Sequence, residues 1–355
     1  MGTSLASLCF GMGSHLELFL TAWAIHGFLQ GFGWPSLSVI LLKWYPKERL
    51  GQMWGLCTTA GNIGQTMAPL VLSTAVILYG WRAAFLFPAA FSFITAMSTW
   101  RLVQDSPESV GLHLTRETTV PLKAKNMAPQ QSVFANFLVH VLPDVRIWSL
   151  CLGSGLIYVV LKGLANWSVV FIIEEKQFTK LEAASVATAF EFGGILGTNA
   201  ACLMSDYLKG QRCLTCCLFI ASAIPGLAFL WHVPARGASG SLWEAHTLSI
   251  GLAAATVVGF SCTGPNAVSG IAMQEMVNPK VRGTASGLQG FFGQLGASLS
   301  GYPLVLLQNV YGWEGVFLGL AGSATMAVCI FLGLSFVEIK HSTVHVANAQ
   351  RRKQI

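Results

Sequence analysis

The feature that most constrains the fold of this chain is an eight-residue sequence motif that occurs twice. YGWRAAFL at 79–86 and YGWEGVFL at 311–318 agree at five of eight positions and stand 232 residues apart. The pair GNIG (61–64) and GQLG (293–296) keeps the same offset of 232 residues. Solenoid repeats have periods of about 20–50 residues, so this period excludes a solenoid. The chain is therefore interpreted as two related halves.

The apolar segments are long enough to cross a membrane. The chain is 53% hydrophobic and only 10% charged, with a mean hydropathy of +0.59, whereas a soluble domain is about 25% charged. Nine runs reach the ~20 residues that a spanning helix needs: roughly 16–42, 51–79, 84–103, 147–173, 183–205, 213–232, 247–274, 284–309 and 313–337. A shorter apolar stretch lies at 3–13. Because backbone groups in lipid must be satisfied within the segment, we expect an all-α integral membrane protein.

The basic residues are distributed unequally between the two sides of the membrane. Sixteen of the 21 Lys and Arg residues fall in segments that share one side, four fall on the other, and Lys162 alone lies inside a span. Loops on the cytosolic side carry an excess of Lys and Arg. The basic side, with the C-terminal tail, is therefore predicted to face the cytosol. Because the charges lie in the loops, the net charge of +6 does not indicate nucleic-acid binding.

A polar stretch at 104–145 separates two groups of spans. We expect a cytosolic linker there, a C-terminal bundle of helices 7–12 at 146–338 and a cytosolic tail at 339–355. Two six-helix halves joined by a linker resemble the plan of the major facilitator superfamily. Residues 1–103 would then be an incomplete N-terminal bundle, with the end of helix 3 and helices 4–6. The repeat offset leaves this half about 86 residues short of its sister, so about 9–10 of 12 helices are expected.

Several motifs narrow the resemblance to one family. LQGFGWP (29–35), KWYPKER (43–49) and GNIGQTMAPL (61–70) are similar to the organophosphate:phosphate antiporters. These include the glycerol-3-phosphate and hexose-phosphate transporters and the glucose-6-phosphate translocase. Four later segments are similar as well: DSPESVGL (105–112), YVVLKGLANWSVVFI (158–172), FEFGGILGTNAACLMSDYLKGQR (190–212) and GTASGLQGFFGQLGASLSG (283–301). The spacing from Trp54 to Gly61 most resembles the glucose-6-phosphate translocase branch.

The resemblance implies a function, a membrane and a set of partners. It implies a secondary transporter that exchanges a sugar phosphate or related organophosphate for inorganic phosphate by alternating access. The branch resemblance implies the endoplasmic reticulum membrane. The expected partners are the organophosphate, inorganic phosphate and the lipid bilayer. We expect a monomer that uses no metal or other cofactor and binds no nucleic acid.

Lys162 is the first candidate for a substrate contact. A cation inside a span is costly and indicates function, and its ammonium group could bind phosphate as a point charge. The alternative is a structural pair with Glu191, the only carboxylate deep in a span, which could also couple to protons. The resemblance implies a phosphate-binding arginine in this helix, but that position is Leu161 here, with Lys162 beside it.

Other polar residues in the spans are either pocket residues or contacts between helices. The resemblance implies a pocket tyrosine at Tyr158, whose hydroxyl could donate to a phosphate oxygen. His26 is interpreted either as a hydrogen-bonded core residue or as a ligand. The further candidates are Gln30, Asn62, Gln65, Asn266 and Gln289. The resemblance places the family's helix-5 histidine at Gly61, and its helix-10 and helix-11 tyrosines at Thr263 and Gln294.

A gating motif is predicted after helix 8. GTNAACLMSDYLKGQR (197–212) is similar to the superfamily's loop 8–9 signature. Asp206 would contact Arg212 or the positively polarised N-terminus of helix 11 at the cytosolic end of the bundle. That contact would hold one of the two states of a rocking transporter.

Two other interpretations remain open at this point. The first is a non-transporting protein with the same fold, either a truncated isoform or a sensor. The second is a carrier of a non-phosphorylated solute, with Lys162 as a structural residue. An enzyme is not expected, because the chain has only three aspartates, none of them deep in a span, and no nucleophile–base spacing.

Overall fold

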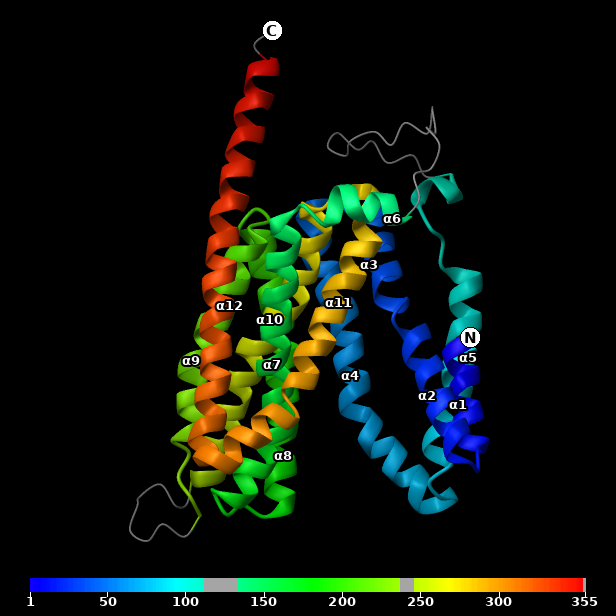
Figure 1. The fold of residues 1–355 in the computed structure, drawn as a ribbon, viewed down its shortest axis with the longest axis vertical. Helices are drawn as coiled ribbons and strands as arrows, with labels where there is room; N and C mark the ends of the chain where they lie inside the picture. The colour runs from blue at the N-terminus through cyan, green and yellow to red at the C-terminus, as the bar shows by residue number, and fades with distance from the viewer. Residues whose placement is uncertain (112–132, 237–245, 354–355) are drawn as a thin grey trace.

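The computed structural model describes residues 1–111, 133–236 and 246–353, and helices make up its regular secondary structure in these ranges (Figure 1). The N-terminal elements are α1 (Gly2–Met12), α2 (Leu16–Gln30), α3 (Gly33–Trp44), α4 (Lys47–Tyr79), α5 (Ala83–Leu102) and the short η1 (Pro107–Val110). The later elements are α6 (Val133–Asn136), η2 (Phe137–Val141), α7 (Val145–Glu174), α8 (Lys180–Tyr207), α9 (Arg212–Trp231), α10 (Thr247–Met276), η4 (Pro279–Val281), α11 (Arg282–Leu299) and α12 (Tyr302–Lys353).

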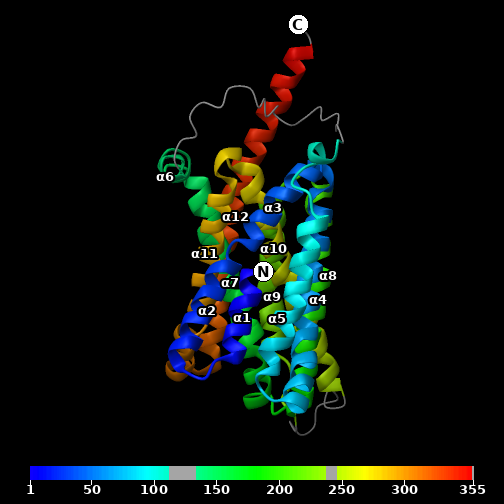
Figure 2. The same cartoon turned by 90° about the vertical axis from the view of Figure 1, so that its right-hand side faces the viewer.

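The helices form two groups that run along the long axis of the molecule (Figures 1 and 2). In the first group, α1 packs against α2 and α5. In the second, α7 contacts α10, α11 and α12, while α10 packs against α8 and α9. The groups meet where α4 contacts α8 and α10, and where α3 contacts α10 and α11. We call these groups the N-half (α1–α5) and the C-half (α7–α12).

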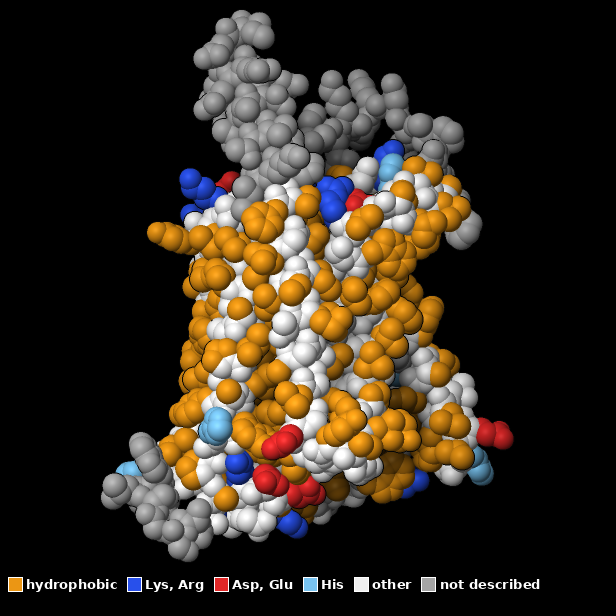
Figure 3. Space-filling view, turned by 60° about the vertical axis from the view of Figure 1, so that its left-hand side comes forward, with side chains coloured by type: hydrophobic (Ala, Val, Ile, Leu, Met, Phe, Trp, Pro, Cys, Tyr) orange, Lys and Arg blue, Asp and Glu red, His pale blue; other side chains and the backbone are white. Residues whose placement is uncertain are grey.

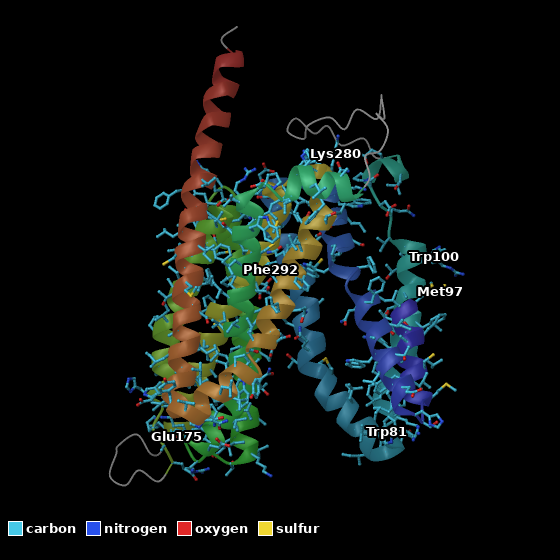
Figure 4. All side chains as sticks on the ribbon, viewed as in Figure 1. Trp81, Met97, Trp100, Glu175, Lys280 and Phe292 are labelled. Carbon is cyan, nitrogen blue, oxygen red and sulfur yellow. The ribbon has the colours of Figure 1, made fainter. Side chains whose placement is uncertain are left out.

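The surface is that of a protein surrounded by lipid. Hydrophobic side chains cover the middle of the molecule, and charged side chains gather near its two ends (Figure 3). Lys280 and the C-terminus lie at one end, which we call the basic end (Figures 1 and 4). Trp81 and Glu175 lie at the other, which we call the opposite end (Figure 4). The apolar band agrees with the predicted all-α integral membrane class.

Seven helical segments of the described chain are long and apolar enough to span a membrane, where the sequence predicts nine spans. The last segment, Pro279–Glu338, is 60 residues long and contains two of the predicted spans. The helix α4, which has 33 residues and covers the predicted span at 51–79, is not among the seven. The difference from nine therefore comes from one double segment and from α4.

Two predicted spans are interrupted. The run at 16–42 is not one helix, because α2 ends at Gln30 and α3 begins at Gly33. The glycines there have low helix propensity, and Pro35 has no N–H group to continue the ladder of hydrogen bonds. The run at 284–309 also breaks, at Ser300 and Gly301, between α11 and α12.

The predicted linker and tail contain helices that the sequence analysis did not predict. Within 104–145 the structure forms η1 and the consecutive helices α6 and η2, which lie across the basic end (Figure 1). Residues 112–132 of this linker are outside the described residues. The helix α12 runs on through the tail to Lys353.

The repeated sequence motif, at 79–86 and 311–318, forms the same turn in both halves. Gly80, between α4 and α5, has φ 82° and ψ 171°. Gly312, inside α12, has φ 65° and ψ −162°. These conformations are nearly closed to residues with a Cβ atom. The glycine of YGW is therefore required by its backbone, and it starts the last helix of each half.

Close backbone contacts position the helices of the C-half. A Cβ atom on Gly296 of α11 would lie 2.0 Å from the carbonyl oxygen of Gly155 on α7. A Cβ atom on Gly197 of α8 would lie 2.0 Å from the carbonyl oxygen of Phe260 on α10. Small residues allow such crossings in membranes. These two crossings set the spacing of the four helices that carry most of the candidate residues.

Replacing Gly312 with alanine tests the turn. No atom lies within 4 Å of the added Cβ, so the expected destabilisation of about 1–3 kcal/mol comes from backbone strain alone. We expect a lower melting temperature in detergent, measured by circular dichroism. The control is Gly322→Ala, at an equally open helical site, where alanine is the better helix former. Equal stability of both variants would show that the turn does not require glycine.

Candidate functional site

Three polar residues follow one face of α7. Ser154, Tyr158 and Lys162 are spaced by four residues, which places them one above another on a helix. The start of the helix is fixed by Asp144, whose side chain accepts a hydrogen bond from the backbone N–H of Arg146. The hydrogen bond from the Arg146 side chain holds the pKa of Asp144 below its usual value. Ser154 is buried, and Tyr158 and Lys162 are half-buried.

Lys162 on α7 has Glu191 on α8 as a carboxylate within electrostatic range. The two side chains do not form an ion pair within 4.0 Å. Among the described residues, no group accepts a hydrogen bond from the Lys162 ammonium. The predicted pair therefore makes no direct bond, and the donors of Lys162 remain available to an anion.

Tyr158 lies between α10 and α11. Its hydroxyl faces the side chain of Asn266 on α10. Its ring packs on Gly293 of α11, where a Cβ atom would lie 3.0 Å from the ring. The sequence analysis selected Tyr158 and Asn266 separately, and the structure places them in contact.

A second polar layer lies one helical turn closer to the basic end. The amide nitrogen of Gln289 donates to the hydroxyls of Ser154 at 2.7 Å and of Ser269 at 3.4 Å. All three side chains are buried. Gln289 was predicted as a pocket candidate, but the two serines were not. Their positions, four residues before Tyr158 and three after Asn266, were the signal that could have found them.

The remaining candidates do not join these layers. His26 stacks on Trp23 of its own helix, with ring centroids 5.7 Å apart. Gln30, Gln65 and Gln294 are exposed, and Asn62 is half-buried. In the described part of the chain, no hydrogen bond connects any of these five to the groups around Lys162. Their predicted contact with a substrate remains a prediction.

Thr263, at a position where the family resemblance implies a tyrosine, has a different contact. Its hydroxyl donates to the carbonyl oxygen of Gly194 at 2.8 Å and to that of Gly259 at 3.0 Å. The Thr263 hydroxyl therefore connects α10 to α8 where the two helices cross. It is therefore a contact between helices, one of the two roles that such residues have in membranes.

Asp206 joins the two halves at the basic end. It accepts from Arg212 at 2.6 Å, as the sequence analysis expected, and Arg212 also pairs with Glu275. Its carboxylate also accepts from the backbone N–H groups of Gly51 at 3.2 Å and Gln52 at 2.9 Å. Of the two predicted contacts, Asp206 makes the one with Arg212, and its other contact is with the second turn of α4 and not with the N-terminus of helix 11. Gly51 and Gly283 share the 232-residue offset, so this part of α4 is the repeat counterpart of the start of helix 11.

Further contacts between the halves lie on the same side of the molecule. Gln274 donates to Ser38 at 3.0 Å, and Asn199 donates to Thr59 at 2.6 Å. The ring of Trp54 lies against Gly270, where a Cβ atom would be 2.9 Å from Cζ2. Toward the opposite end, the helices of the two halves diverge (Figure 1). The halves are therefore closed together at the basic end.

Comparisons with known proteins agree on the family. A sequence profile of the Major Facilitator Superfamily matches residues 1–301. The probable hexose phosphate transport protein of Chlamydia muridarum is 31% identical over 343 residues, which cover 93% of this chain and 73% of that protein. The chain belongs to the organophosphate:phosphate antiporter family of the major facilitator superfamily.

Two further relatives from Salmonella typhimurium have similar coverage. The membrane sensor protein UhpC is 29% identical, over 94% of this chain and 74% of that protein. The hexose-6-phosphate:phosphate antiporter is 28% identical, over 94% of this chain and 72% of that protein. The structure of the human organic anion transporter MFSD10 has a TM-score of 0.65 at 17% identity, covering 93% of this chain and 75% of that one. This structural likeness confirms the major facilitator fold.

In this major facilitator protein, Asp206→Asn tests the contact at the basic end. The change removes the charge that pairs with the fully buried Arg212 and that accepts from two backbone N–H groups of α4. Breaking a buried ion pair costs about 3–5 kcal/mol, so we expect the closed contact to loosen. Spin labels on Glu48 and Lys209 should report longer distances by electron–electron double resonance.

The matched control is Asp105→Asn, the same change at an exposed carboxylate. We expect it to leave the distance distribution as in the wild type. An unchanged distribution in Asp206→Asn would mean that the remaining contacts between the halves hold them closed without this carboxylate.

Proposed function

We propose that the protein is a secondary active transporter that exchanges a sugar phosphate or related organophosphate for inorganic phosphate. The observation that carries this proposal is Lys162. Lys162 lies in the interior of a 30-residue span, one helical turn from Tyr158, and it makes no direct ion pair with Glu191. A compact cation with free donors is suited to a phosphate group.

The arrangement of the halves supports alternating access. The contacts of Asp206, Gln274 and Trp54 hold the basic end closed, while the helices diverge toward the opposite end (Figure 1). Rocking of one half against the other around a central site is the usual mechanism of this architecture. In the proposed cycle, the halves 1–103 and 146–338 rock about the connection 104–145, and release of the Asp206 contact opens the basic end.

The names of the relatives support the substrate class. Relatives at 31% and 28% identity are named as a hexose phosphate transport protein and a hexose-6-phosphate:phosphate antiporter. We propose the same class of cargo here. The family consists of transporters, so the proposal includes no enzymatic step. The protein acts as a monomer in the lipid bilayer.

The second candidate function is that of a sensor. A relative at 29% identity is named a membrane sensor protein, and this identity is close to those of the transporter relatives. A sensor would bind the organophosphate at the same site without moving it across the membrane. A carrier of a non-phosphorylated solute is a third possibility, which predicts no role for Lys162 in binding an anion.

The proposed topology places the basic end in the cytosol. The excess of Lys and Arg at this end supports it. The resemblance to the glucose-6-phosphate translocase branch supports the endoplasmic reticulum as the membrane. Protease protection of a C-terminal tag in sealed microsomes tests the topology, because a cytosolic C-terminus is digested without detergent.

Phosphate counterflow in proteoliposomes tests the function. Vesicles loaded with inorganic phosphate should take up labelled phosphate and labelled hexose 6-phosphate. Lys162→Gln should abolish both activities, because the site loses its central cation. Lys180→Gln, the same change at an exposed lysine, should retain them.

Any other result of the counterflow experiment would support one of the three alternatives: a structural Lys162, a sensor, or a carrier of a non-phosphorylated solute. Wild-type exchange in Lys162→Gln would assign Lys162 to a structural pair with Glu191. Absence of exchange in the wild type, with a hexose 6-phosphate-dependent thermal shift that Lys162→Gln removes, would select the sensor. Uptake of a neutral sugar without phosphate exchange would select the third function.

A further inference from the structure

The amide group of Gln289 has a fixed orientation. The hydroxyl of Ser269 donates to the carbonyl oxygen of Asn266 at 3.0 Å, and the hydroxyl of Ser154 donates to Ser269 at 3.5 Å. Because both hydroxyl protons are used, both hydroxyl oxygens act as acceptors toward Gln289. The amide nitrogen must face the serines, and the amide carbonyl must point away from them.

The carbonyl oxygen of Gln289 remains without a donor. None of the described residues donates a hydrogen bond to it. This oxygen is accessible to solvent. By contrast, Oε1 of Gln274 is buried away from solvent and has no hydrogen-bond partner among the described residues. A carbonyl acceptor is thus held in place by two buried serines and stays accessible.

This carbonyl oxygen lies near the proposed anion site formed by Lys162 and Tyr158. Gln289 lies one turn before Gly293, on which the ring of Tyr158 packs. Ser154 and Lys162 are eight residues apart on α7, which corresponds to about 12 Å along the helix. The cation and the carbonyl therefore lie at two levels of one polar face, separated by roughly the length of a small phosphorylated sugar.

The chemistry of the two levels differs. An ammonium and a tyrosine hydroxyl donate to phosphate oxygens, whereas a carbonyl oxygen repels them and accepts from a hydroxyl. We propose that Gln289 accepts a hydrogen bond from a hydroxyl of the sugar part and so distinguishes an organophosphate from inorganic phosphate. Ser154 and Ser269 are the positioning residues. This inference rests on the proposed function and adds to it which end of the substrate lies toward the basic end.

The test is a ratio of two Michaelis constants in Gln289→Leu. In proteoliposomes loaded with phosphate, KM is measured for glucose 6-phosphate and for inorganic phosphate. Loss of one hydrogen bond is expected to raise the ratio of these KM values about 3- to 10-fold. Ser154→Ala and Ser269→Ala should raise the same ratio by a smaller factor. A purely structural role would change both KM values together.

The matched control is Gln308→Leu, which removes an amide at the start of α12, where it contacts Glu174 at 3.5 Å. Its ratio should equal that of the wild type. A second measurement needs no variant. In the wild type, one of a series of singly deoxygenated glucose 6-phosphates should have a KM about 3- to 10-fold higher than glucose 6-phosphate.

The outcomes separate this inference from the proposed function. An unchanged ratio in Gln289→Leu, or equal KM values for all the deoxygenated sugars, overturns the inference while exchange itself persists. Absence of exchange in wild-type vesicles overturns the proposed function. In that case calorimetry gives the dissociation constants of glucose 6-phosphate and of phosphate for the wild type and for Gln289→Leu. The ratio of the two constants in each protein then shows whether Gln289 contacts the sugar part.

Discussion

A polar group that faces hydrocarbon without a partner costs several kcal/mol, and this cost decides where the polar residues of this chain lie. In the C-half they satisfy one another in layers between α7, α10 and α11. Tyr158 faces Asn266, and Gln289 donates hydrogen bonds to Ser154 and Ser269. The glycine contacts that bring these helices together are what allow such short side chains to meet. The site therefore depends on the packing of backbones as much as on the polar residues themselves.

Much of the fold follows from the sequence, because the bilayer leaves few alternatives. Long apolar runs in lipid must be helices, and the repeated motif indicates two related halves. In the structure the glycine of both copies, Gly80 and Gly312, has a positive φ. Local interruptions and short helices are harder to predict from the sequence. The span at 16–42 keeps its predicted place, at Leu16–Trp44, but its helix is interrupted at Gly31 and Phe32. A short helix, α6, forms within a segment whose composition indicates only a polar linker.

The site could be predicted only in part. Lys162 and Glu191 stand out because charges are rare inside spans, and the structure brings them near each other. The serines at 154 and 269 do not stand out, because a serine in a helix can satisfy itself on a preceding carbonyl. The sequence also could not predict which helix Asp206 contacts in addition to Arg212. The first turns of α4 and α11 are related by the repeat, and only the packing of the two halves selects α4.

The partial compensation of Lys162 bears on why the proposed transport would be an exchange. Moving an empty site through an occluded state would enclose an ammonium whose partner, Glu191, is not within ion-pair distance. An uncompensated buried charge costs several kcal/mol, so the empty protein would switch slowly. A bound phosphate or organophosphate supplies the missing negative charge and removes this barrier. In the proposed mechanism each passage across the membrane then requires an anion in the site, which couples the outward movement of one phosphate compound to the inward movement of another.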